Sequence, residues 1–135
     1  MQVAEYLQNH PGVQQVLYPG LKNDAAHSLA TRYMKLADTD ESLFGYMLSI
    51  EIKEKNVGNS DNARAFYDGL NMIWRATDLG RVKTVATLNA ISTHQQQGEE
   101  GRAIAAIKPN TVRISIGLED PVDIIADLEL GLKRV

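Results

Sequence analysis

The clearest pattern in the sequence is an alternation of polar and apolar residues near the C-terminal end. Its apolar members would share one face of a strand: Val112, Ile114, Ile116 and Leu118. The polar and small members would share the other face: Thr111, Arg113, Ser115 and Gly117. Arg113 is therefore the one cation on the polar face, and a guanidinium held in a rigid strand presents a planar fork of donors to a carboxylate or phosphate.

Similar patterns predict the other elements. A second alternating segment, Gly45 to Lys53, predicts a strand, and Asp120-Pro121 predicts a helix start with an acidic N-cap and proline at the first helical position. The remaining expected elements are a helix before Pro11, a strand over Val13 to Tyr18, a helix capped by Asp24, a helix capped by Ser60 or Asp61, extended segments over Met72 to Thr77 and Val82 to Thr87, a short helix over Gly98 to Ala106, and a last helix that buries Ile124, Ile125, Leu128 and Leu132.

This order is α-β-α-β-α-β-β-α-β-α. Because the clear strands have one apolar face, we predict an α+β fold in which helices cover one side of a sheet. A chain of 135 residues is expected to form one domain, residues 1–135. It begins inside an apparent helix, which suggests a fragment boundary.

Composition excludes several classes of function. The net charge of −3 argues against nucleic acid as a partner, and the absence of cysteine excludes disulfides and thiolate sites. No apolar run approaches ~18 residues and no signal-peptide pattern is present, so we expect no membrane partner and a cytoplasmic location. The three histidines have no metal-ligand spacing, and neither a P-loop nor a dinucleotide fingerprint occurs.

The residues alone do not decide which side chains form a functional site. Arg113 could bind an anion, but an ion pair with Glu51 or Glu119, or exposure to solvent, is the more common situation for such an arginine. Asp78 could line a cleft at a strand end, although a turn-forming role is favoured. His94 could belong to a site or brace a polar loop. No acid–base pair can be assigned from spacing.

Several segments, in the same order, resemble the Cys/Met-metabolism family of enzymes that use pyridoxal phosphate (PLP). The family includes cystathionine γ-synthase, cystathionine lyases, methionine γ-lyase and O-acetylhomoserine sulfhydrylase. The most specific segment is VRISIGLED, from Val112 to Asp120. The others are His10-Pro11 through Tyr18-Pro19-Gly20-Leu21, GYMLSIE from Gly45 to Glu51, Leu79-Gly80 with Val82-Lys83-Thr84, Thr93-His94, and Ile124 to Leu132.

This resemblance implies the C-terminal small domain of a fold-type-I PLP enzyme, with a mostly antiparallel sheet and helices on its outer side. It implies that Arg113 binds the substrate α-carboxylate, that Thr77 and Asp78 are substrate-binding, and that Leu79, Thr93 and His94 line a cleft. The Schiff-base lysine of the family lies upstream, so no catalytic residue and no metal are expected here. PLP is expected only in the parent enzyme, with none bound by this chain alone.

The implied partners are a large PLP-binding domain, a small sulfur amino acid or acyl-homoserine, and further copies in a homo-oligomer. Two positions depart from the family pattern: Asp78 replaces a serine, and Leu88-Asn89-Ala90 replaces a His-Pro-Ala segment. A carboxylate at Asp78 could repel an amino acid's carboxylate or select a cationic group. The alternatives are a free-standing remnant that acts as a non-catalytic association module, and an unrelated α+β ligand-binding domain.

Overall fold

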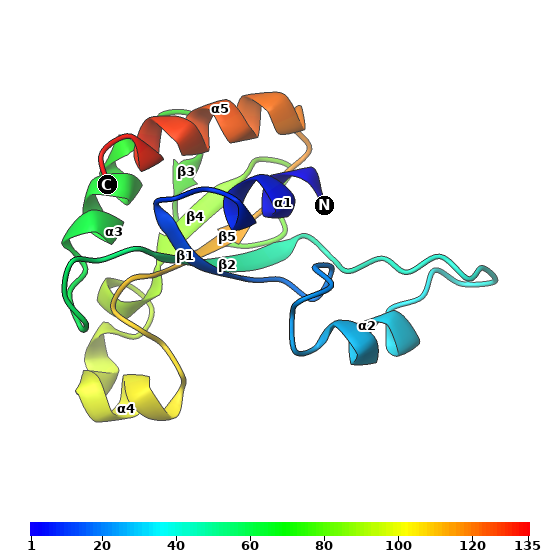
Figure 1. Cartoon of the computed structure of the whole chain (residues 1–135), viewed down its shortest axis with the longest axis horizontal. Coiled ribbons are helices and arrows are strands. Elements are labelled where there is room, and N and C mark those ends of the chain that lie inside the picture. Colours follow the sequence, from blue (N-terminus) through cyan, green and yellow to red (C-terminus); the bar gives the residue numbers. More distant parts are fainter.

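The computed structural model describes all residues, 1–135, and its elements follow the predicted order (Figure 1). The helices are α1 (Gln2–Gln8), α2 (His27–Tyr33), α3 (Asp61–Gly69), α4 (Gly98–Ile104) and α5 (Pro121–Leu132). The strands are β1 (Val13–Leu17), β2 (Met47–Ile52), β3 (Trp74–Arg75), β4 (Val85–Leu88) and β5 (Thr111–Ser115). Two short 3₁₀ turns, η1 (Asn89–Ile91) and η2 (Gln95–Gln97), lie between β4 and α4. None of the helices combines the length and apolarity needed to cross a membrane.

The strands form one sheet in the order β1-β2-β5-β4-β3. All neighbours are antiparallel except β3 and β4, which are parallel. The predicted mixed fold with a mostly antiparallel sheet is therefore confirmed. Strand β5 is central, and Arg113 lies opposite Ser49 on β2 and Thr87 on β4. Hydrogen bonding on both sides makes β5 a rigid support for the side chains it carries.

The core lies between the sheet and the helices α1, α3 and α5, which cover one of its faces (Figure 1). The sheet contributes alternate apolar residues of β2 and β5, and the helices contribute fully buried side chains such as Phe66, Ile124 and Leu128. Each such side chain stabilises the fold by about 1.5–3 kcal/mol. Helices α3 and α5 approach closely, since a Cβ on Gly131 would lie 2.7 Å from the carbonyl oxygen of Phe66. The predicted apolar face is confirmed for Val112 and Ile114, but β5 ends at Ser115, and Leu118, expected on the same face, is 84% exposed.

The helix caps agree with the sequence at α5 and differ at two other helices. Asp120 accepts a hydrogen bond from Val122 N at 2.8 Å, and Pro121 opens α5 as predicted. The prediction that Asp24 caps α2 is wrong, because Ala26 is the N-cap. Ser60 is the N-cap of α3 but makes no side-chain cap hydrogen bond. A carboxylate from the preceding turn, that of Glu54, accepts from the N–H groups of residues 62 and 63 instead.

Strand β3 is much shorter than the predicted extended segment over Met72 to Thr77, and β4 begins later than predicted. The N–H groups of Met72 and Ile73 donate to Asp127, so they do not join a strand ladder. Beyond Arg75 the chain leaves the sheet edge and crosses toward β5. Both limits of β3 are therefore set by side chains distant in the sequence.

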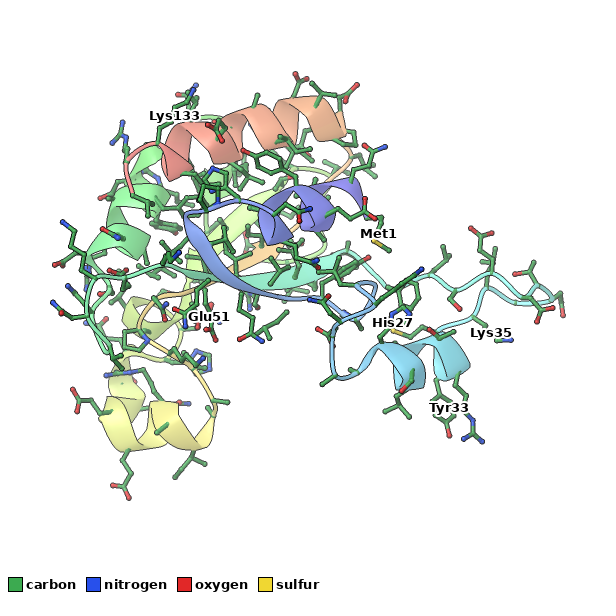
Figure 2. All side chains as sticks on the ribbon, viewed as in Figure 1. Met1, His27, Tyr33, Lys35, Glu51 and Lys133 are labelled. Carbon is green, nitrogen blue, oxygen red and sulfur yellow. The ribbon has the colours of Figure 1, made fainter.

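Helix α2 and the turn after it project from the body of the protein (Figure 1). Leu29 and Tyr33 have the helical spacing with Ala30 that is typical of a packed helix face, yet they are 59% and 67% exposed. Only Ala30 of this helix is buried, and a bridge between Lys35 and Ser42 closes the hairpin that follows. Figure 2 shows Tyr33 and Lys35 on this projection, away from the sheet. The helical spacing was correct, but its apolar face has no partner within this chain.

Candidate functional site

Arg113 projects from the face of the sheet opposite the helices, because its neighbours Val112 and Ile114 are fully buried in the core. Its Nη2 donates to the carbonyl oxygens of Thr77 at 2.7 Å and Asp78 at 3.4 Å. The guanidinium forms no salt bridge, and neither Nε nor Nη1 has a hydrogen-bond partner. The charge of Arg113 is therefore not neutralised within the chain.

The carboxylates that the sequence offered as partners of Arg113 are engaged elsewhere. Glu51 is 3% exposed and pairs with Lys108 at 2.7 Å, and Figure 2 shows it on the side of β2 away from α5. Glu119 accepts from Thr84 N at 2.8 Å and from Thr84 Oγ1 at 2.7 Å. The alternative in which Arg113 forms an ion pair with either residue is therefore excluded by the structure.

Residues 76 to 81, here called the crossing segment, run from β3 across the end of the polar face. Thr87 Oγ1 donates to the carbonyl oxygen of Ala76, and Ser115 Oγ accepts from Gly80 N at 3.0 Å. The carbonyls that hold Arg113 lie between these two contacts. The structure thus brings together Arg113, Thr77 and Asp78, as the resemblance implied.

The carboxylate of Asp78 faces Arg81, with Oδ2 and Nη2 2.5 Å apart. Both side chains are about half exposed, at 45% and 50%. The expected repulsion between Asp78 and a ligand carboxylate is therefore offset by a neighbouring cation. Leu79, the next residue, is 53% exposed and makes no core contact.

Thr93 and His94 are not joined to Arg113 by any polar contact. They lie between η1 and η2, and Thr93 Oγ1 is 2.7 Å from His94 Nδ1. The nearby Asn89 has a buried Oδ1 atom without a hydrogen-bond partner. Their assignment to a cleft stays a prediction.

A cavity with a volume of about 440 Å³ lies beside the crossing segment. It is mostly apolar and opens between the start of α1, the start of β2 and the end of β5. Its walls include Met1, Tyr18, Tyr46, Val82, Leu118 and Ile124. Neither Arg113 nor any lysine lines it, but Gly80 and Arg81 of the crossing segment do, so the cavity adjoins the candidate site.

A polar contact ties α1 to α5 on the far side of the core. Tyr6 donates to Glu129 Oε2, and His10 Nε2 lies 3.3 Å from the same oxygen. Burial, together with the hydrogen bond and charge of Glu129, raises the pKa of Tyr6 to about 12. His10 Nδ1 accepts from Gly12 N at 3.0 Å. This cluster has both its ring nitrogens and its carboxylate engaged, and it serves to hold the two helices together.

Glu119 has a lowered pKa. Partial burial raises it, but the two hydrogen bonds from Thr84 and the nearby charge of Lys83 outweigh that effect. The carboxylate therefore stabilises the fold above its usual pKa of 4.5, and this contribution is lost as pH falls below that value. Glu119→Gln should lower the free energy of unfolding at pH 7 but have a much smaller effect at pH 3.

Urea unfolding of both proteins at the two pH values would check this expectation. Glu100→Gln, at an exposed position of α4, is the matched control and should change little at either pH. An equal loss of stability from Glu119→Gln at pH 3 and pH 7 would contradict the role given to the ionised carboxylate.

The sequence did not single out Thr87 and Ser115, the two residues that hold the crossing segment. Both are polar and almost fully buried, at 2% and 1% exposed. For Ser115 the signal was present, since it lies on the polar side of the alternating strand β5, whereas Thr87 lies in β4, whose residues do not alternate and are all buried. What the sequence lacked was the identity of their partners, because residues 76 to 80 contact them only through main-chain atoms.

Comparison with known proteins gives a consistent result over almost the whole chain. A family model for Cys/Met metabolism PLP-dependent enzymes matches residues 1–133. The chain is 37% identical over 135 residues to an O-acetyl-L-homoserine sulfhydrylase from Leptospira meyeri, covering 100% of this chain and 28% of that protein. It is 36% identical over 133 residues to an L-methionine gamma-lyase from Fusobacterium nucleatum subsp. polymorphum, covering 98% and 31%.

A solved structure shows the same similarity in three dimensions. Cystathionine gamma synthase from Xanthomonas oryzae pv. oryzae, in complex with cystathionine, matches with a TM-score of 0.83 and 36% identity. The match covers 98% of this chain and 32% of that one. The chain therefore spans about a third of the length of the relatives it matches.

Proposed function

Because this chain belongs to the Cys/Met-metabolism family of PLP-dependent enzymes, we propose that it is the C-terminal part of a transsulfuration-type enzyme. Its role would be to supply Arg113 as the group that binds the substrate α-carboxylate. The observation that carries this proposal is the state of Arg113, which is fixed on the central strand and has no carboxylate partner in the chain. Such a guanidinium is suited to a carboxylate delivered by a substrate.

The physical contribution of Arg113 is orientation. A carboxylate held by the planar guanidinium loses its rotational freedom, and the bonds at the neighbouring carbon are then set relative to the rest of the site. Because β5 has a strand on each side, the main chain that carries the arginine is held by hydrogen bonds from both neighbours. Thr77 and Asp78 hold one edge of the guanidinium through their carbonyls and would complete the substrate-binding wall.

PLP, when bound, acts as an electron sink for the carbanion that forms on an amino-acid substrate. The lysines of this chain do not fit as its anchor. Lys83 lies over the ring of Trp74 at 4.6 Å, and Lys108 pairs with the buried Glu51. None of the larger cavities contains both Arg113 and a lysine. We therefore assign the anchoring lysine and the cofactor phosphate site to a large domain outside this chain.

Two observations support the assignment to the small C-terminal domain. The sheet is mostly antiparallel with helices on one face, as the resemblance led us to expect of that domain. The segments that resemble the family also occur here in the order expected for its C-terminal domain. The similarity to an O-acetyl-L-homoserine sulfhydrylase and an L-methionine gamma-lyase supports a substrate that is a sulfur amino acid or an acyl-homoserine. The enzyme would be a cytoplasmic homo-oligomer.

The coding sequence upstream of Met1 tests the proposal. An in-frame domain that supplies the anchoring lysine is expected, and expression of the whole reading frame should give a PLP-loaded enzyme. The isolated chain, mixed with PLP and reduced with borohydride, should yield no stoichiometric lysine adduct by mass spectrometry. A stoichiometric adduct on one lysine of this chain would contradict the division of roles.

A second candidate function is a free-standing association module. It is favoured by large apolar side chains exposed at the rim of the apolar cavity, where Val82 and Leu118 are 74% and 84% exposed. A stop codon and ribosome-binding site directly upstream would support this candidate. Sedimentation velocity should then show self-association that Leu118→Glu removes.

A further inference from the structure

We propose that Thr87 and Ser115 are positioning residues that hold the crossing segment so that its carbonyls orient Arg113. The inference rests on the proposed function, since it assigns the residues that prepare Arg113 for a carboxylate. Neither side chain would touch the substrate. Both act through the main chain of residues 76 to 80.

Thr87 fixes the first end of the crossing segment. It lies directly opposite Arg113 on β4, and its side chain is 2% exposed. Its hydroxyl donates to the carbonyl oxygen of Ala76, while Ala76 N donates to the carbonyl oxygen of Ala86 at 3.1 Å. Residue 76 is therefore held from both its N–H and its C=O groups, one residue before Thr77.

Ser115 fixes the other end. It follows Arg113 by two residues on the same face of β5, and its side chain is 1% exposed. Its Oγ accepts from Gly80 N at 3.0 Å. Gly80 has a φ of +70°, a conformation that other residues rarely adopt, so the turn there is also defined by the backbone. Thr77 and Asp78 lie between the two fixed points.

The consequence is a pre-oriented guanidinium. An unrestrained arginine loses much rotamer freedom on binding a ligand, and this loss weakens affinity. Here Nη2 is already held by Thr77 O at 2.7 Å, so part of that freedom is lost on folding. Nε and Nη1 have no partner and stay available to a carboxylate. Loosening the crossing segment should therefore weaken carboxylate binding without removing any group that contacts the ligand.

The experiment uses the chain with sodium acetate as the carboxylate probe. Binding and the ¹H–¹⁵N signal of the Arg113 Nε–H group are followed by NMR for the wild type and for Thr87→Val, Ser115→Ala and Thr87→Ser. Thr87→Val keeps the shape and removes the hydroxyl, whereas Thr87→Ser keeps the hydroxyl. Thr39→Val is the matched control, because Thr39 Oγ1 makes the same kind of bond, to Leu36 O, on the projecting hairpin.

Thr87→Val and Ser115→Ala should raise the acetate Kd roughly three- to tenfold, the effect expected from one lost hydrogen bond. Both should also broaden or shift the Arg113 Nε–H signal in the absence of acetate. Thr87→Ser should restore the wild-type Kd and signal, and Thr39→Val should change neither.

An unchanged Arg113 signal in both Thr87→Val and Ser115→Ala would overturn the positioning role. So would a Thr87→Ser protein that behaves like Thr87→Val. Failure of the proposed function is distinguished from these results, because it would appear as equal acetate binding by the wild type and Arg113→Ala. The Nε–H signal decides the positioning role in that case also.

Discussion

Arg113→Ala is expected to lower kcat/KM of the complete enzyme by roughly two to three orders of magnitude. Removing one partner of a desolvated, hydrogen-bonded charge pair costs about 2–5 kcal/mol, and each 1.4 kcal/mol is a factor of ten. The loss has two parts, because the substrate binds more weakly and its reacting bonds are no longer oriented. Steady-state kinetics on the whole reading frame would measure both.

Two further variants sharpen this test. Arg113→Lys keeps the charge but not the planar fork, so it should fall between the wild type and Arg113→Ala. Arg75→Ala removes a more exposed arginine on edge strand β3, where it pairs only with Asp68 at 3.4 Å, and should retain wild-type kinetics. An Arg113→Ala enzyme within threefold of the wild type would show that this arginine does not bind substrate.

Asp127→Ala is expected to destabilise the fold by about 3–5 kcal/mol. This carboxylate is 4% exposed and accepts three main-chain hydrogen bonds, from Asn71 N, Met72 N and Ile73 N, each at 2.9 Å. Its removal leaves three N–H donors without partners at the point where α3 turns into β3. Denaturant unfolding with a shared m-value would measure the loss.

The matched control for this prediction is Asp123→Ala. Asp123 lies in the first turn of the same helix, α5, and its side chain is exposed. Its substitution should lower the free energy of unfolding by less than about 1 kcal/mol, because only the interaction of an acid with the helix N-terminus is lost. Comparable losses from both variants would mean that the three hydrogen bonds of Asp127 contribute little to stability.

Local patterns were sufficient to predict the elements of this fold. The alternation that identified β2 and β5 reflects burial of one sheet face, because apolar residue types occupy the buried positions. The start of α5 was also predictable, because Asp120 and Pro121 act within one helical turn. These features depend on neighbours in the sequence and therefore leave a readable signal.

Contacts between distant segments were not predictable in this way. Asp127 resembles a solvated helix residue in the sequence, and its partners lie more than fifty positions away. Glu54, which replaced the expected side-chain cap of α3, lies only eight and nine positions from its partners, but it precedes the helix by more than the one turn that a capping pattern covers. For helix α2 the local pattern was misleading. Leu29 and Tyr33 have the spacing of a packed helix face, but they have no surface to pack against in this chain.

The residues of the candidate site also differ in whether the sequence could identify them. Arg113 was found because it is the single cation on an alternating strand, and its proximity to Thr77 and Asp78 came from the resemblance. Thr87 and Ser115 emerged only from the structure, because their partners are main-chain atoms that carry no side-chain signature. The pairing of Asp78 with Arg81 also required coordinates, since a turn residue gives no indication of where its carboxylate points.

The most direct measurement is a calorimetric titration of the chain with acetate, wild type against Arg113→Ala. The account predicts saturable binding by the wild type and a Kd at least tenfold higher for the variant. Equal binding by the two proteins, or no binding by the wild type, would show that Arg113 is not a carboxylate-binding residue.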